Sequence, residues 1–147
     1  MANQSTEINE KKFGSDELEK IVRKLQSCSD PKRRYEYLLF LAKNLPDVSI
    51  ESFKKSDKVK GCVSQVYVQG ELIEGKLFWK GYSDALITKG MLALLIKGLN
   101  NLTPKAVLEI DPNFILSTGL NKSLTSSRAN GFMNIFLKMK NQASGYV

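Results

Sequence analysis

The sequence predicts an α+β fold in which helices gather against one face of a small antiparallel sheet of about three strands. Two stretches with helical spacing of apolar residues come first, then a run that alternates polar and apolar residues between glycines, then further helical stretches. Helices and strands that occupy separate blocks of the chain are typical of α+β domains. With 147 residues, 42% of them hydrophobic, the chain is long enough to build one core.

The N-terminal residues 1–14 are polar and mixed in charge, and we expect them to form a disordered tail. A single domain is then expected over residues 15–147. The start of the chain lacks the apolar stretch of a signal peptide, and no segment approaches the roughly 20 apolar residues of a membrane span. These features predict a cytoplasmic protein, with a plastid-type setting left open.

Two helices are predicted before the sheet. Ser15 predicts the start of the first, because its hydroxyl can accept a hydrogen bond from a free backbone N–H. Asp30 followed by Pro31 predicts the start of the second, and Pro46 its end. The second helix is expected to bury one apolar face: Tyr35, Leu38, Leu39, Ala42 and Leu45.

A hairpin is predicted in the middle of the chain. Residues 65–69 alternate between polar or aromatic side chains and valine, and residues 76–82 provide a returning strand. Gly70 and Gly75 bracket the region in which the chain turns. We expect a third, short strand just before Cys62.

Helices return after the hairpin. Ser83 or Asp84 is expected to cap a long helix that ends near Leu99, and two short helices should begin where a capping residue precedes a proline, at 103–104 and 111–112. The last helix should open at Ser126 or Ser127 and bury a stripe of apolar side chains: Phe132, Ile135, Phe136 and Met139.

Cys62 is the residue that most suggests chemistry. It follows Gly61, which lets another molecule approach closely, and it ends a segment that contains Lys54, Lys55, Lys58 and Lys60. Nearby lysines favour the reactive thiolate, an effect that Asp57 partly offsets. The alternative is a buried cysteine that serves only as a small apolar side chain. From Gly61 and the apolar Val63 we hypothesise that a loop shelters the thiol and swings out on a partner.

The composition excludes several kinds of chemistry. Histidine is absent, which rules out Ser–His and Cys–His nucleophile pairs. Two cysteines without histidine cannot form the usual four-ligand zinc sites, and they are few for an iron–sulfur cluster. We expect no metal site and two free thiols, with Cys28 a structural or incidental residue in a polar turn.

The net charge of +7 is spread along the chain, with lysines interleaved among acidic residues. This pattern is typical of a solvated surface, and no nucleic-acid-binding motif accompanies it. We expect neither nucleic acid nor membrane as a partner.

Four blocks together resemble one family. The block 61–67, GCVSQVY, resembles the signature of SufE-type sulfur acceptor proteins. Blocks 34–39 with 45–46, 81–85 with 89–90, and 127–131 fall in the same order as their counterparts in that family. The resemblance runs from about residue 15 to residue 142. Val63 stands where the family often has glutamine, and Tyr67 where it often has tryptophan.

The resemblance implies a function and a fold shared with IscU-type scaffolds. A cysteine desulfurase (SufS-like), which uses pyridoxal phosphate, would pass persulfide sulfur to Cys62 and be stimulated by the transfer. The sulfur would then go to an iron–sulfur scaffold complex (SufBCD-like). This chain would bind no cofactor and act as a sulfur-transfer accessory, not as a hydrolytic enzyme. A CsdE-type paralogue that serves another desulfurase is the alternative, and an iron–sulfur scaffold is less favoured.

The same resemblance implies which residues surround the thiol, namely Gly61, Ser64, Gln65, Asp84 and Arg128. Asp84 has a simpler reading as a helix N-cap. Arg128 lies in the first turn of a helix, where a cation is unfavourable, so we expect it to pair with a carboxylate such as Asp84 or with the desulfurase. Partner contacts are expected at Lys58, Lys60 and Tyr67, and a homodimer through an exposed strand face is left open.

Overall fold

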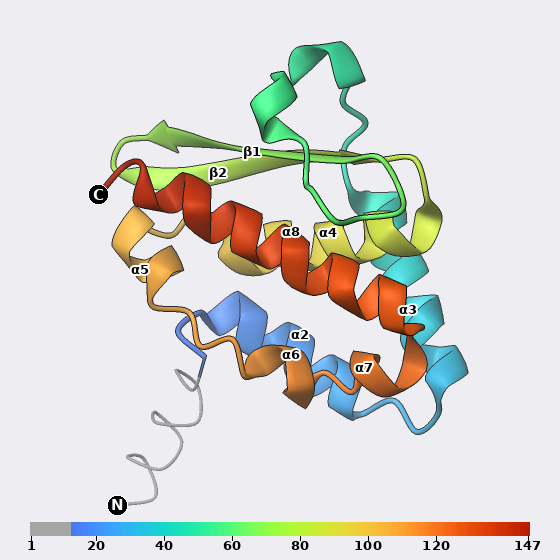
Figure 1. Cartoon of the computed structure of the whole chain (residues 1–147). Coiled ribbons are helices and arrows are strands. Elements are labelled where there is room, and N and C mark those ends of the chain that lie inside the picture. The colour runs from blue at the N-terminus through green and yellow to red at the C-terminus, as the bar shows by residue number, and fades with distance from the viewer. Residues whose placement is uncertain (1–12) are drawn as a thin grey trace, which may run out of the picture.

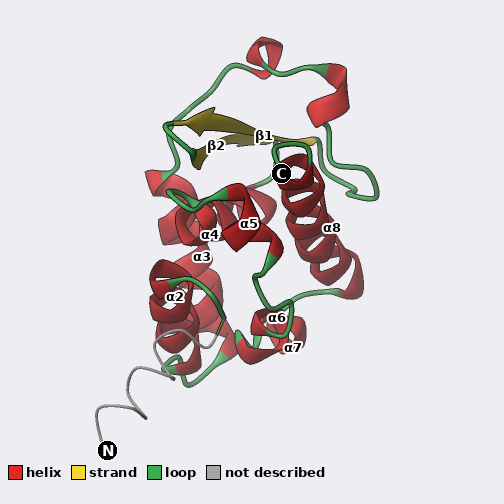
Figure 2. Ribbon diagram, turned by 90° about the vertical axis from the view of Figure 1, so that its left-hand side faces the viewer, coloured by secondary structure: helices red, strands yellow, loops and turns green. Residues whose placement is uncertain are grey.

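Helices cover one face of a two-stranded antiparallel sheet in this computed structural model, which describes residues 13–147 (Figure 1). The α+β class predicted from the sequence is confirmed. A segment with two short 3-10 turns lies over the opposite face of the sheet (Figure 2). The elements in chain order are α2 (Asp16–Gln26), α3 (Pro31–Asn44), η1 (Ile50–Ser52), η2 (Lys55–Asp57), β1 (Val66–Ile73), β2 (Lys76–Ser83), α4 (Leu86–Leu99), α5 (Pro104–Leu108), α6 (Phe114–Ser117), α7 (Leu120–Ser123) and α8 (Ser126–Ser144).

The folded part begins earlier than Ser15. Most of the predicted tail, residues 1–12, lies outside the described residues. Phe13 is only 3% exposed, and its ring meets the Phe114 ring in an edge-on contact with the centroids 6.4 Å apart. Burial of a whole aromatic side chain contributes substantially to a core. Phe13 therefore belongs to the domain and not to the tail.

Local caps start α2 and α3 where the sequence predicts them. Ser15 Oγ accepts from the Leu18 N–H at 3.2 Å, and Asp30 Oδ1 accepts from the Arg33 N–H at 2.9 Å. The start of α5 after Thr103 is confirmed in the same way. The predicted face of α3 is wrong at one position. Leu39 is 40% exposed, and the buried side chains of that helix are Leu38, Leu41 and Ala42.

The sheet has two strands and not three. β1 pairs with β2 from Val66 opposite Ser83 to Ile73 opposite Lys76, around a two-residue turn in which Glu74 and Gly75 both have positive φ. This geometry matches the twist of a hairpin. Gly70, predicted to bracket the turn, lies within β1.

The expected third strand is reduced to a single bridge between Lys58 and Tyr67. At this bridge, a backbone hydrogen bond joins the Val59 N–H to the Val66 carbonyl at 2.8 Å. The preceding residues form η2, and a 3-10 turn cannot continue a ladder. The chain therefore reaches the sheet only at this point before it enters the segment that carries Cys62.

The inner face of the sheet packs on α4 and α8. Val66, Val68 and Leu77 are fully buried, and Trp79 is nearly so. The predicted stripe of α8 is confirmed, because all four of its side chains are buried. Gly90 lets α4 approach α3, since a Cβ there would lie 2.4 Å from the Leu38 carbonyl oxygen. Among residues 13–147, no helix has the length and apolar composition needed to cross a bilayer.

Candidate functional site

Cys62 lies on a short loop, residues 60–65, that we call the Cys62 loop. The bond between Val59 and Val66 closes its base. Gly61 has φ +80, which side chains other than glycine adopt only with strain. A Cβ at Gly61 would also lie 2.6 Å from Nδ2 of Asn134, which donates a hydrogen bond to the Gly61 carbonyl at 3.2 Å. The positive φ therefore favours glycine at this position, and a side chain there would also displace the Asn134 amide.

The Cys62 side chain is half-buried against α8. Its thiol donates a long hydrogen bond, 3.7 Å, to the carbonyl oxygen of Gly131. A Cβ at Gly131 would lie 3.5 Å from the sulfur, an ordinary van der Waals distance, so the thiol packs directly on this turn of α8. Burial raises the pKa of the Cys62 thiol, and no lysine contributes to the shift. The expectation that neighbouring lysines favour the thiolate is therefore not supported while the loop is closed.

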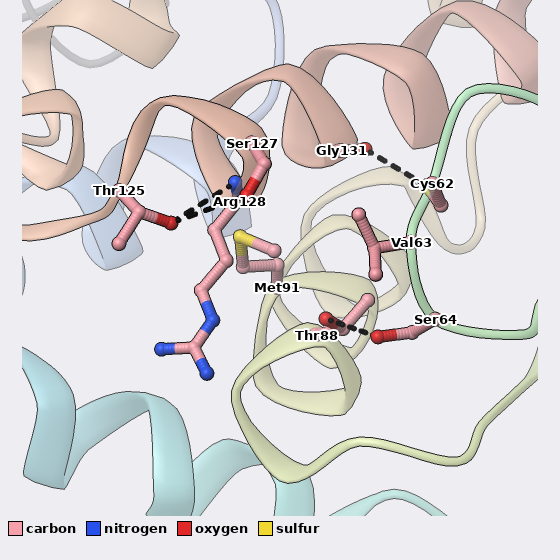
Figure 3. A pocket seen from close by; sticks show the side chains of 9 residues that line it. All are labelled: Cys62, Val63, Ser64, Thr88, Met91, Thr125, Ser127, Arg128 and Gly131. Carbon is pink, nitrogen blue, oxygen red and sulfur yellow. Dashed lines mark hydrogen bonds between the residues drawn. The ribbon is translucent and has the colours of Figure 1, made fainter.

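A cavity of about 350 Å³ opens beside Cys62. Figure 3 shows its walls, which come from the Cys62 loop, from α4 and from the N-terminal turns of α8. Its volume falls in the range of small-molecule pockets, and it can receive a side chain of another protein. The lining residues are Cys62, Val63, Ser64, Thr88, Met91, Thr125, Ser127, Arg128 and Gly131.

Asp84 fastens the end of the Cys62 loop. Its Oδ1 accepts from the Gln65 N–H at 3.0 Å. The N-cap residue of α4 is Ala85, and no side chain caps that helix, so the expectation that Ser83 or Asp84 caps it is wrong. Ser64 adds a second attachment, since its hydroxyl lies 3.4 Å from that of Thr88. These contacts hold the loop against α4.

Arg128 lines the cavity from the first turn of α8 (Figure 3). Its backbone N–H is bonded to the Thr125 hydroxyl, which caps the helix. Within residues 13–147, the Arg128 guanidinium has no ion pair, so the expected pairing with Asp84 is not formed. The side chain is exposed and carries its charge to the mouth of the cavity.

The remaining predicted residues lie outside the cavity. Lys58 and Lys60 are exposed on the segment that leads to the loop. Tyr67 is on the outer face of the sheet, where its ring lies 5.6 Å from that of Phe53. Cys28 lies in the turn between α2 and α3, and its thiol donates to the Lys24 carbonyl in the last turn of α2. In the described part of the chain, no group of three or more metal-ligating side chains exists.

Several residues are not predicted as part of the site: Thr88, Met91, Thr125, Ser127 and Gly131 in the lining, of which the last two fall in the family block 127–131, and Asn134 beneath the loop. Gly131 carries a signal, because glycine inside a helix costs about 1 kcal/mol relative to alanine and so indicates close packing. Asn134 carries none. Its role depends on a contact with Gly61, 73 positions away in the sequence.

Comparisons with known proteins place the chain in a family and match its fold. A family model described as SufE, Fe-S metabolism associated domain, matches residues 19–143. A solution structure of a hypothetical protein from Thermus thermophilus superposes with a TM-score of 0.77, covering 89% of this chain and 96% of that one. At 24% identity, this likeness concerns the fold alone.

Three curated relatives cover most of this chain. An uncharacterized SufE-like protein of Synechocystis is 50% identical over 88% of this chain and 81% of its own length. SufE-like protein 1, chloroplastic/mitochondrial, of Arabidopsis thaliana is 39% identical over 86% of this chain and 34% of its own. The cysteine desulfuration protein SufE of Plasmodium vivax is 40% identical over 84% of this chain and 51% of its own length. The chain thus spans about half of the Plasmodium relative and a third of the Arabidopsis one. From the family match and the Synechocystis relative together, the chain belongs to the SufE family.

Proposed function

We propose that Cys62 accepts persulfide sulfur from a cysteine desulfurase and hands it on for iron–sulfur cluster assembly. The observation that carries the proposal is a half-buried thiol on a short loop that turns at Gly61, at the wall of a cavity of about 350 Å³. Membership of the SufE family supports it, as do relatives named cysteine desulfuration proteins. The receiver of the sulfur would be an iron–sulfur scaffold of the SufBCD kind.

The transfer step needs no oxidant. The Cys62 thiolate attacks the terminal sulfur of the donor's cysteine persulfide, as in thiol–disulfide exchange. A new S–S bond forms at Cys62 while the donor's S–S bond breaks, and the donor cysteine leaves as a thiolate. The proton lost by Cys62 balances the proton that the donor thiolate takes up. The donor is restored to its thiol state, which explains how acceptance can stimulate it.

The described residues fit the two stages of such a cycle. In the loop as the structure has it, burial raises the pKa of Cys62 and so favours the protonated thiol, which is the less reactive form. Loop opening would return Cys62 to solvent and lower its pKa toward the ordinary value, so that the thiolate forms where the donor waits. Arg128 at the cavity mouth would meet the negative charge of a persulfide.

Mass spectrometry of the intact chain tests the proposal. After incubation with cysteine and a cysteine desulfurase of the same organism, the wild-type chain should gain one sulfur atom on Cys62. Cys62→Ser should gain none and should leave the desulfurase unstimulated, whereas the matched Cys28→Ser variant should behave as wild type. Stimulation by Cys62→Ser equal to that by wild type would contradict the proposal. Repeating the assay with each desulfurase of the organism separates the SufS-like donor from a paralogous one.

A further inference from the structure

The segment 54–60 presents lysines without exposed acids. Lys54, Lys55, Lys58 and Lys60 are all exposed, and we call them the lysine face. The only acid of the segment, Asp57, is 7% exposed and points inward. The sequence alone suggests that Asp57 offsets part of the lysine charge, but the fold withdraws its carboxylate from the surface.

Asp57 is engaged in holding the segment in place. Its Oδ2 accepts from the Lys54 N–H at 2.9 Å and from Nε2 of Gln69, on β1, at 2.8 Å. Val59 is buried, and Nζ of Lys138 on α8 donates to the Ser56 carbonyl. The backbone beneath the lysine face is therefore fixed, so that binding has only the lysine side chains to order.

The charge of the lysine face has no use inside the molecule. Among residues 13–147, none of these lysines forms an ion pair with a carboxylate. Burial is the cause of the raised pKa of Cys62, and no lysine is among its causes. Three exposed acids flank the segment: Glu51, which is bonded to a serine hydroxyl, Glu71 on β1, and Asp84, which holds the Gln65 N–H of the Cys62 loop. The four lysines outnumber these carboxylates, so the surface stays positive.

The lysine face runs directly into the Cys62 loop. Lys60 is its first residue, and Figure 1 shows the preceding segment over the sheet, on the side away from the helices. A protein that brings a persulfide to the cavity would meet this face at the rim of the contact. Val63, 91% exposed at the loop tip, would be covered by the same partner.

We propose that the lysine face docks an acidic surface of the sulfur donor next to its persulfide cysteine. This inference rests on the proposed function. Charges at the rim of an interface chiefly set the association rate and its salt dependence, so they suit a carrier that must bind and leave repeatedly.

The test compares two charge reversals of equal size. Lys58→Glu with Lys60→Glu changes the lysine face, and Lys76→Glu with Lys105→Glu places the same charge change at the hairpin turn and on α5, at the far end of the molecule (Figure 1). Binding to the cysteine desulfurase is measured across a salt series. The first pair should weaken binding about tenfold or more at low salt and flatten the salt dependence. The second should stay within about twofold of wild type.

Two readouts separate the possible failures. Iodoacetamide should alkylate Cys62 equally fast in both variants and in wild type, which shows that the loop is intact. Equal affinities and salt slopes for the two variants would overturn the docking inference while sulfur acceptance by wild type still stands. A wild-type chain that acquires no sulfur would remove the proposed function, and the inference with it.

Discussion

Helix α8 holds two neighbouring regions of the molecule in different ways. Near its start, it meets the Cys62 loop through contacts of 3.7 Å at Gly131 and 3.2 Å at Asn134. Near its end, Gln142 meets the outer edge of β1: Nε2 donates to the Val68 carbonyl at 2.8 Å and Oε1 accepts from the Gly70 N–H at 2.9 Å. One helix therefore secures the strand edge firmly and the loop weakly.

The two attachments serve different purposes: one covers the free edge of β1, and the other lets the Cys62 loop move. An open strand edge invites pairing with other chains, and the side-chain amide of Gln142 fills the positions that a further strand would take. Tyr146 adds a bond to the Gly70 carbonyl. The Cys62 loop must instead be able to leave α8 if a donor is to reach the sulfur, and the thiol that bonds Gly131 is only a weak hydrogen-bond donor. A homodimer through the outer face of the sheet stays a prediction.

Gln142→Leu should have the largest effect on stability. It leaves the Val68 carbonyl and the Gly70 N–H without partners, each at a cost of about 1–3 kcal/mol if water cannot replace Gln142. Since both groups are part-buried, we expect a total loss near the lower end, about 2 kcal/mol, in chemical denaturation. Light scattering should also detect self-association at the exposed edge.

The neighbouring Asn141→Ala is the control, because the Asn141 side chain is exposed on the same turn of α8. Its free energy of unfolding should remain within about 0.5 kcal/mol of wild type. If Gln142→Leu were equally neutral, the hydrogen bonds of Gln142 would not secure the edge of β1.

Gly61→Ala should have the next largest effect on stability, and it acts on the Cys62 loop. A positive φ costs a residue with a side chain about 1 kcal/mol or more, and the new Cβ would press on Asn134. We expect a stability loss of about 1–2 kcal/mol and faster alkylation of Cys62.

The double variant with Asn134→Ala separates the two causes. The double variant should recover the part of the stability loss that the contact with Asn134 causes, and keep the part that the positive φ causes. A double-mutant cycle separates the two. Slower alkylation of Cys62 in Gly61→Ala than in wild type would contradict a loop held closed by this turn.

The sequence predicts features that depend on contacts between residues close together in the chain, and it fails for features that depend on distant ones. Ser15 and Asp30 mark helix starts because each caps a backbone N–H three residues away. Asp84 has the same chemistry, but the Gln65 N–H, 19 positions earlier, takes its carboxylate instead. The position of Cys62 follows from the family motif. The cavity does not, because α4 and α8 supply most of its wall and only the folded chain brings them together.

Asn134→Ala should scarcely change stability and should still change reactivity. The variant loses one hydrogen bond of 3.2 Å at the protein surface, which contributes about 0.5 kcal/mol or less. Cys62 should nevertheless react about two- to threefold faster with iodoacetamide. Loss of the hydrogen bond removes this free energy from the closed loop, so the population of the open loop rises by that factor. An unchanged alkylation rate would show that Asn134 does not restrain the loop.

The pH dependence of alkylation gives the smallest and most specific effect. Burial raises the pKa of Cys62, so the pH–rate profile of a Cys28→Ser chain should have its midpoint above the value of about 8.5 for free cysteine. The folded state holds this proton more tightly than the unfolded state. Its contribution to stability is therefore full below the unfolded pKa and is lost as the pH rises through the folded one. Adding Asn134→Ala should move the midpoint back toward the ordinary value, because the open loop exposes the sulfur. A midpoint at or below about 8.5 in the Cys28→Ser chain would mean that the loop does not shield the thiol. The weaker attachment of the loop to α8 would then have no effect on the reactivity of Cys62.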